Sequence, residues 1–393
     1  MNTTWPETTL LLGAGASAEA GVPTTRPMTQ KLVSAIDEAR HPESPLAEAL
    51  HFVCGALLAY DSADGINPFE GLDVERVFAA VELLAERQSL EVSPFVSAWH
   101  PAVDSHDSKQ QSAPGMFDNQ LKDAVLNSES FDSAGKLITG LVTSLTKVTP
   151  TGEAYKELAR AMLSELRNLI WTTPKDASYL VPLVADLVEG TPVAIATLNY
   201  DLTIEQAAEQ ASVSCTTGIE QWLQDGDWHW PDSGVRLLKL HGSINWVWER
   251  QEHQDGQLPI DAIRITDEPA NDWDRPAVVF GQRGKLRAEG PFLALLAEFE
   301  RHLSQSKHLL VVGYSFRDPH VNEVIRRWTS EDLGRELTIV DPNWPNQFGG
   351  DTEDFRRQLA HYLLPPSWDE TKFKARLDIW DEPCSQAVAR ISG

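Results

Sequence analysis

Six short apolar segments, each followed by a loop rich in Gly, Asn, Asp or His, constrain the fold of this chain more than any other feature. Several are nearly uninterrupted apolar runs, which is typical of parallel strands covered by helices on both faces. Helical patterns alternate with the strand segments. The sequence therefore predicts an α/β fold with a Rossmann-like, mostly parallel sheet and helices on both faces. The strand segments are 8–12, 192–197, 235–240, 277–280, 308–312 and 336–340, and the helical patterns are 27–39, 202–211, 291–304 and 319–329.

The long region between the first two strand segments has helical patterns and almost no strand signal. We therefore expect a helical module at 41–189, inserted into a Rossmann-like domain formed by 1–40 and 190–393. Within the module, the polar stretch 100–115 is expected to lie in a loop at 100–118. A second irregular stretch, 249–276, is expected to be a surface excursion. The helical patterns of the module are 46–60, 73–87, 134–147, 153–170 and 178–188.

Charge and cysteine content restrict the partners and the compartment. The formal net charge is −25, from 33 basic and 58 acidic residues, which argues against direct binding to nucleic acid. Cys54, Cys215 and Cys384 lie far apart without a CxxC pair, so we expect neither a disulfide framework nor a cysteine zinc site. No apolar run approaches the roughly 18 residues of a membrane span, and we expect the N-terminal segment to be a strand entering a loop rather than a signal peptide. These features favour a cytoplasmic protein.

The first motif is the glycine-rich segment LLLGAGASAEAGVP at 10–23. Gly13 and Gly15 would let the backbone approach a pyrophosphate, and the start of a following helix would present N–H groups to it. Ser17 would add a hydroxyl. Such a turn can equally be a bare tight turn with no ligand.

Two further motifs follow strands. Asn199 and Asp201 lie in TLNYD at 197–201, and His241 lies in LKLHGSINW at 238–246. Asparagine and aspartate at a strand exit can be simple turn residues, and an isolated histidine is usually structural. Their shared position at strand exits nevertheless makes them candidate site residues.

The last two motifs repeat this arrangement. VVGYSFRDPHVNEVI at 311–325 is a strand, glycine and serine turn that leads into a helix, with Asp318 and Pro319 as the expected helix start. Asp341 ends the strand in TIVDPN, where an acid suits the diol of an adenosine ribose. A turn or helix-capping role for Asp341 is the alternative.

The order GAGAS, TLNYD, LHG, GYS and VDPN resembles that of the sirtuin (silent information regulator) family. KLHGSINW and VVGYSFRDPHVN resemble more closely the bacterial sirtuin-like family found in antiphage defence effectors. These matches span about residues 8–345, and GLDVERVFAAVELL at 71–84 adds a weaker one.

The resemblance implies that NAD, as the substrate, lies across the strand ends. Asn199 and Asp201 would position the nicotinamide ribose and a water, and His241 would be the general base. No metal is implied. The resemblance places the NAD contacts at Gly13, Ala14, Gly15, Ser17, Thr24, Arg26, Asn199, Gly313, Ser315, Asp341 and Asn343.

Two departures from the sirtuin pattern bear on activity. Thr24 replaces the acid of the sirtuin segment GIPDFR, although Arg26 is retained. Residues 243–290 contain no cysteine, so the four-cysteine zinc module beside the acyl-lysine groove is missing or rebuilt. The expected activity is therefore hydrolysis of NAD to nicotinamide and ADP-ribose, as an abortive-infection effector. An NAD-dependent protein deacylase and a non-catalytic NAD or ADP-ribose scaffold are the alternatives.

Unregulated loss of NAD would poison the host, so the enzyme needs a control. The resemblance implies a homo-oligomer paired with a HerA-type DNA-translocating ATPase, and any contact with DNA would come through that partner. Tryptophans cluster at 221–231 and 244–248, where they are expected either to anchor an interface or to pack in the core.

Overall fold

In the computed structural model, the chain forms two compact units. One unit comprises Met1–Pro27 and Leu166–Gly393, and the other comprises Met28–Glu165. The predicted module boundaries of 41–189 stay a prediction. The structure describes residues 7–40, 44–63, 72–87, 89–90, 103, 152–186, 192–251, 260–267, 275–279, 290–345, 354–364 and 375–392.

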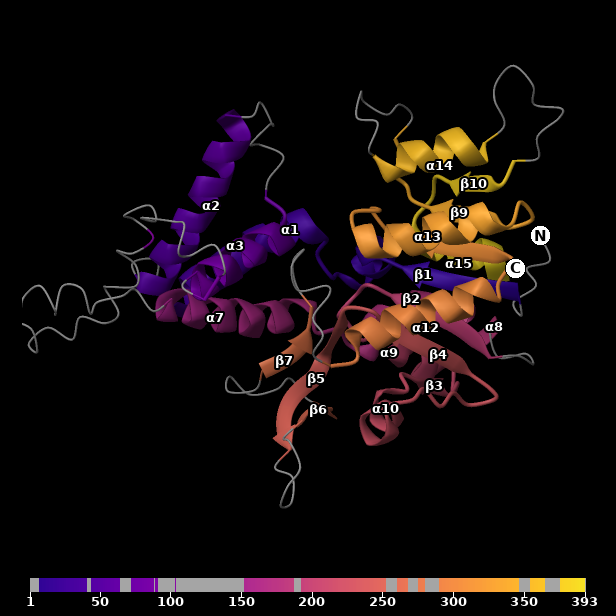
Figure 1. Cartoon of the computed structure of the whole chain (residues 1–393), viewed down its shortest axis with the longest axis horizontal. Coiled ribbons are helices and arrows are strands. Elements are labelled where there is room, and N and C mark those ends of the chain that lie inside the picture. Colours follow the sequence, from indigo (N-terminus) through magenta and orange to yellow (C-terminus); the bar gives the residue numbers. More distant parts are fainter. Residues whose placement is uncertain are drawn as a thin grey trace, which may run out of the picture. The chain divides into compact units, whose positions relative to one another are not determined.

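A seven-stranded sheet with strand order β10-β9-β8-β1-β2-β4-β3 forms the centre of the first unit (Figure 1). Every neighbouring pair in it is parallel, which confirms the predicted α/β fold. The central strand β1 is buried at all five residues because helices cover both faces. The strands are β1 (Thr8–Leu12), β2 (Val193–Thr197), β3 (Cys215–Thr216), β4 (Val235–Lys239), β8 (His308–Val312), β9 (Glu336–Val340) and β10 (Leu377–Trp380).

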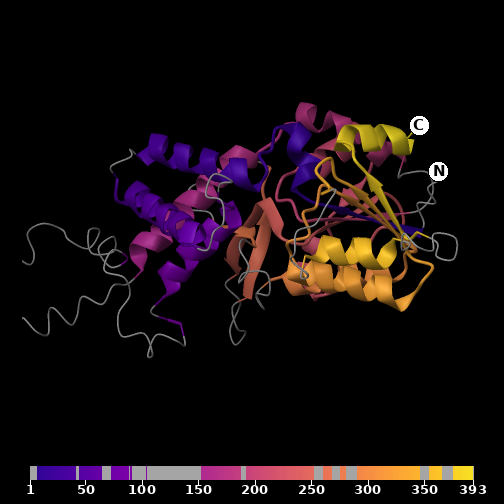
Figure 2. The ribbon, with the colours of Figure 1, turned by 90° about the horizontal axis from the view of Figure 1, so that it is seen from above.

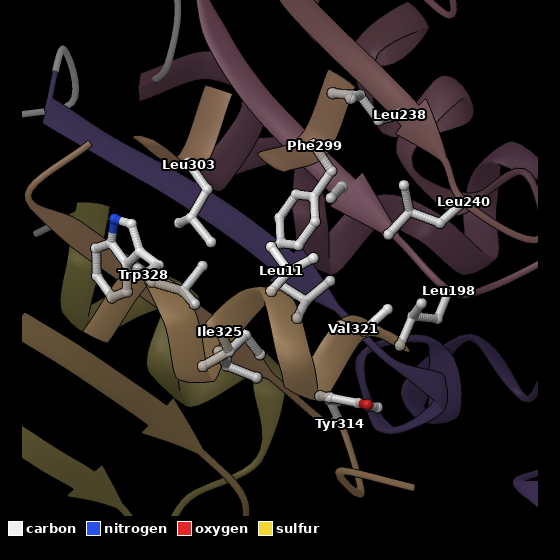
Figure 3. Close-up of a cluster of buried hydrophobic side chains, with 14 of the residues drawn as sticks. Leu11, Leu198, Leu238, Leu240, Phe299, Leu303, Tyr314, Val321, Ile325 and Trp328 are labelled. Carbon is white, nitrogen blue, oxygen red and sulfur yellow. The ribbon is translucent and has the colours of Figure 1, made fainter. Parts of the chain in front are cut away.

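Alternate residues of β1 face two different cores. Leu11 packs with Phe299 and Ile325 in one cluster (Figure 3), whereas Leu10 and Leu12 belong to a second cluster on the opposite face. The two helix layers are seen edge-on in Figure 2, with α15 on one side of the sheet. The first face is covered by α12 (Phe292–Ser304), α13 (Pro319–Glu331) and α14 (Phe355–Leu363). The second is covered by η2 (Ala14–Ala20), η5 (Pro174–Leu180), α8 (Val181–Asp186), α9 (Thr203–Gln210) and α15 (Cys384–Ser392).

A separate antiparallel sheet corrects two predictions. It has the order β6-β5-β7, with β5 (Gly242–Gln251), β6 (Ile260–Ile265) and β7 (Arg275–Val278). The segment 277–280 was predicted among the main strands, but residues 277 and 278 belong to β7, which pairs with β5 instead. The prediction of an irregular excursion at 249–276 is wrong where β6 forms, because apolar residues of IDAIRI pack against the core.

The tryptophan-rich segments mostly cover apolar core. Trp246 of β5 is fully buried in the first core cluster. Trp222 of α10 (Ile219–Asp225), Trp228 and Trp230 are half-buried and stack on one another against the same cluster. An interface role for these side chains stays a prediction.

The second unit is helical in its described part. Asp73 caps α3 by accepting a hydrogen bond from the Glu75 backbone N–H, within the segment GLDVERVF. Asp61 of α2 accepts two hydrogen bonds from Arg76 of α3, which ties these helices together. The helices are α1 (Thr25–Arg40), α2 (Pro45–Ala63), α3 (Val74–Glu86) and α7 (Glu153–Ile170), the first and last of which cross the unit boundary.

Some expectations fall outside the described residues. They are the helix at 134–147 and, apart from residue 103, the loop at 100–118. The predicted helix 178–188 is split into the end of η5 and α8. None of the helices in the described part of the chain has the length and apolar character that a bilayer span requires.

Candidate functional site

Asn199 and His241 leave neighbouring strands at the same edge of the sheet. Thr197 of β2 pairs with Lys239 of β4, and each candidate lies two residues beyond its strand's paired residue. Leu240 continues the ladder by donating its N–H to the Thr197 carbonyl. Parallel strands place their carboxyl ends at one edge, where ligands of open α/β sheets bind. The predicted convergence of these two loops is therefore present.

The apolar residues before these side chains anchor both loops. Leu198 and Leu240 belong to one core cluster together with Val321, near the start of α13 (Figure 3). Leu198 is also fixed by its backbone, since its N–H donates to the Leu12 carbonyl of β1. The site is thus built on the packed end of the sheet rather than on a free loop.

The structure shows why glycine is needed at two positions of the glycine-rich turn, which the sequence alone does not reveal. A Cβ on Gly13 would lie 2.6 Å from the Gly313 carbonyl oxygen, and one on Gly15 would lie 2.7 Å from the Gly313 Cα. The N–H groups of Gly13 and Gly15 donate to the carbonyls of Val312 and Gly313. These glycines therefore let the exits of β1 and β8 pack directly on each other. A pyrophosphate contact for Gly13, Ala14 and Gly15 stays a prediction, and the helix that follows is the short 3-10 helix η2.

Asn199 is held by its amide nitrogen. Its Nδ2 donates to the Gly13 carbonyl at 2.9 Å and to Ser17 Oγ at 2.9 Å. Because a carbonyl can only accept, the bond to Gly13 fixes which end of the amide points inward. The oxygen Oδ1 accepts no hydrogen bond from any residue that the structure describes.

A one-way chain of hydrogen bonds extends from Asn199 to Asp201. Thr203 Oγ1 donates to Asp201 Oδ1 at 2.7 Å, which leaves it free to accept from Ser17 Oγ at 3.3 Å. Ser17 in turn accepts from Asn199. Every hydroxyl in the chain then donates toward the carboxylate, so Asp201 helps to orient the Asn199 amide.

Asp201 also has a structural role. Its Oδ1 accepts from the backbone N–H of Thr203, the first residue of α9, at 3.0 Å, while Leu202 is the N-cap residue of this helix. Its carbonyl accepts from Lys239 Nζ, a fully buried amine that also pairs with Glu205. Asp201 therefore contacts the first N–H group of α9 without being its N-cap residue, and a catalytic role for Asp201 stays a prediction.

His241 is a buried side chain that contacts a buried carboxylate. Its Nε2 lies 2.9 Å from Asp318 Oδ2, and the two side chains are 7 % and 3 % exposed. The Tyr200 ring lies 6.2 Å from the imidazole centroid. The backbone carbonyl of His241 accepts from the Val279 N–H, which joins the loop that carries His241 to the end of β7. The ring nitrogen Nδ1 makes no hydrogen bond to the described residues.

Asp318 is the site residue that sequence reasoning missed. It was expected to start a helix, and its Oδ1 does accept from the N–H groups of His320 and Val321 at the start of α13. Its partner His241 lies 77 residues earlier, so no local pattern reveals the pair. The one signal in the sequence is that Asp318, in DPHVN, is an acidic residue in the loop after a strand, as Asp201 is.

The other predicted contacts are distributed along the same edge. Gly313 adopts a left-handed φ of 63° and donates its N–H to Val340 of β9. Ser315 is exposed beside it. Asp341 follows β9, two strands from β1, and its Oδ1 accepts from the N–H of the exposed Asn343.

Thr24 is half-buried just beyond η2, whereas the Arg26 side chain lies outside the described residues. Tyr179 of η5 donates its hydroxyl to the Ala16 carbonyl, which braces η2. Burial is the main cause that raises the pKa of Tyr179, so this hydroxyl stays a donor. Within the described ranges, His, Cys, Asp and Glu form no group of three that could hold a metal ion.

Residues 193–366 match the family model for the SIR2-like domain, and this segment carries Asn199, His241 and Asp318. A comparison with curated proteins found no match. Solved structures with some similarity include a mutant Sir2 homologue with ADP-ribose, with 11% identity, a TM-score of 0.37, and coverage of 98% of this chain and 90% of that chain. A Sir2 homologue in complex with NAD has 12% identity, a TM-score of 0.35, and coverage of 98% and 87%.

The fold of the first unit is defined by the strand order of its parallel sheet. The similarity to the SIR2-like domain applies to residues 193–366, which are less than half of the chain.

Proposed function

We propose that this chain is an NAD hydrolase that cleaves the nicotinamide–ribose bond to give nicotinamide and ADP-ribose. One observation carries the proposal: Asn199 Oδ1 and His241 Nδ1 are both left without partners among the described residues, at the ends of adjacent parallel strands. The SIR2-like domain match supports NAD as the substrate.

The reaction needs little covalent chemistry from the protein. The bond between ribose C1′ and the pyridinium nitrogen breaks, and nicotinamide leaves as a neutral molecule with the bonding electron pair. Positive charge then develops on the ribose, as in glycoside hydrolysis. The oxygen of a water bonds to C1′, and the water gives up one proton.

The two unpartnered atoms suit this step. Asn199 Oδ1 is an acceptor that can orient a water or a ribose hydroxyl, since both its amide hydrogens are already donated to Gly13 and Ser17. A neutral His241 can take up the proton at Nδ1. Neither side chain has to change its existing contacts to act.

The test is to incubate the purified chain with NAD and to quantify nicotinamide and ADP-ribose by chromatography. We expect both products in equal amounts, and we expect His241→Ala to lower the rate about 10²- to 10⁴-fold. His361→Ala, an exposed histidine on α14, is the matched control and should retain the parental rate. Unchanged NAD hydrolysis by both His241→Ala and Asn199→Ala would contradict the site assignment.

The same assay distinguishes the two alternatives. A deacylase would release nicotinamide only when an acylated peptide is added, and would form O-acyl-ADP-ribose. A scaffold would bind NAD without consuming it. Either result would overturn the hydrolase proposal.

We also propose that this hydrolase acts as a homo-oligomeric antiphage effector that is controlled by a HerA-type ATPase. The support is the resemblance of KLHGSINW and VVGYSFRDPHVN to that bacterial family, together with an acidic surface that disfavours direct binding to DNA. Size-exclusion chromatography of the chain, alone and with the ATPase, tests the assembly. A monomer both alone and with the ATPase would contradict the assembly. In cells, the concentration of NAD should fall only after phage infection.

A further inference from the structure

We propose that Asp318 is a positioning residue that selects the tautomer of His241 and leaves Nδ1, rather than Nε2, as the basic nitrogen. The consequence for the reaction rests on the proposed NAD hydrolysis. The tautomer itself depends only on the geometry of the buried pair.

The contact decides where the imidazole hydrogen lies. A carboxylate can only accept hydrogen bonds, so Nε2 must donate to Asp318 Oδ2 across their 2.9 Å separation. A neutral imidazole carries one hydrogen, which leaves the lone pair on Nδ1. Among the described residues, the His241 side chain makes no other hydrogen bond, and its remaining ring contact is with Tyr200.

The carboxylate is held on its other oxygen. Asp318 Oδ1 accepts from the backbone N–H groups of His320 at 2.9 Å and Val321 at 3.3 Å. These bonds leave Oδ2 to face the histidine. Asp318 therefore joins the start of α13 to the end of β4 with a single side chain.

The turn that presents Asp318 is braced by two buried polar residues. Tyr314 Oη accepts from the Asp318 N–H at 3.1 Å and donates to Asn322 Oδ1 at 2.9 Å. Asn322 Nδ2 donates to the Phe316 carbonyl at 2.7 Å. Phe316 is buried and has a left-handed φ of 57°, a conformation that non-glycine residues adopt only when their surroundings impose it.

The two oxygens of Asp318 can be tested separately. In Asp318→Asn, Oδ1 can still cap α13, but an amide NH₂ replaces the oxygen that faces His241. The Nε2 atom must then accept a hydrogen bond, and the imidazole hydrogen moves to Nδ1. The variant should keep its fold and lose its base.

The first measurement is steady-state NAD hydrolysis. We expect Asp318→Asn to lower kcat about 100-fold with an unchanged KM, because the substrate contacts remain and only the proton acceptor is lost. The melting temperature should stay at the parental value. Asp354→Asn, which alters the cap of α14, is the matched control and should leave kcat unchanged.

The second measurement reads the tautomer without any activity. Nitrogen-15 NMR of the histidine side chains, with the His241 signals assigned from His241→Ala, should show hydrogen on Nε2 in the parent and on Nδ1 in Asp318→Asn. A parent with hydrogen on Nδ1, or an Asp318→Asn variant with parental kcat, would overturn the proposal. If the parent failed to hydrolyse NAD but showed the Nε2–H tautomer, the proposed function would fail and the assignment of the tautomer would stand.

Discussion

The two candidate side chains are held in place in different ways. Asn199 is fixed by a backbone carbonyl and by a series of hydroxyls that ends at Asp201. His241 is fixed by one carboxylate, which reaches it from the loop after β8, across the ends of β1 and β2. Because the Asn199 amide donates two hydrogen bonds, we expect it to keep its orientation when one of them is lost. The tautomer of His241 depends on one contact, so we expect it to change when the carboxylate of Asp318 is lost.

The largest effect should come from Gly313→Ala, which disturbs both arrangements. A Cβ there would lie 2.4 Å from the Ala16 backbone nitrogen, and the residue has a left-handed φ. We expect about 3 kcal/mol or more of destabilisation, measured by urea unfolding, with loss of NAD hydrolysis. Gly226→Ala has a similar φ with no atom within 4 Å of the added Cβ, so it should cost only about 1 to 2 kcal/mol. Equal losses of stability in Gly313→Ala and Gly226→Ala would show that the turns after β1 and β8 are not tightly packed on each other.

Asn199→Asp should break only the Asn199 arrangement. The substitution places a second acceptor against the Gly13 carbonyl in a buried position, which should cost about 1 to 3 kcal/mol. The side chain must turn away, and we expect NAD turnover to fall about 100-fold. Thermal melting and the nicotinamide assay measure the two effects. Parental turnover would mean that the orientation of this amide does not matter.

Asp201→Asn distinguishes a positioning role from a catalytic role for Asp201, the residue at which the series of hydrogen bonds from Asn199 ends. Asparagine keeps an oxygen that can accept from the Thr203 N–H and hydroxyl, so stability and turnover should remain near parental values. Asp201→Ala removes both bonds from Thr203 and should cost about 1 kcal/mol in chemical unfolding. A large loss of turnover in a folded Asp201→Asn variant would instead assign the negative charge a role in the reaction.

Ser17→Ala should have a smaller effect than Asn199→Asp. Asn199 keeps its bond to the Gly13 carbonyl, and we expect a loss of stability of about 1 kcal/mol and a few-fold decrease in kcat. Steady-state kinetics separates two roles for this residue. A lower kcat with unchanged KM supports orientation of Asn199, whereas a raised KM supports the NAD contact implied by the family resemblance.

The sequence predicted the parts of the fold and site that local patterns encode. The apolar strands β1, β2, β4, β8 and β9 were predicted within one residue of their observed limits, because buried parallel strands are continuous apolar runs. The common edge for Asn199 and His241 followed from topology alone. These features need no knowledge of which side chains meet.

Contacts between distant segments could not be predicted. Asn199 and Ser17 are 182 residues apart, and nothing in either motif indicates that they bond. The pyrophosphate contact of Gly13 and Gly15 stays a prediction, whereas their close approach to the Gly313 backbone is a contact that neither motif indicates. The strand β6 was missed because the charged residues of IDAIRI weaken its apolar pattern.

The central position of β1 has a consequence for synthesis of the chain. Its partners are β2 at 193–197 and β8 at 308–312, so Leu10, Leu11 and Leu12 leave the ribosome long before either partner exists. Pairings this distant in sequence form slowly, and unpaired apolar strands are prone to aggregate. Nascent chains that stop before residue 308 should therefore bind chaperones through their first strand, and release should follow only after β8 has been made.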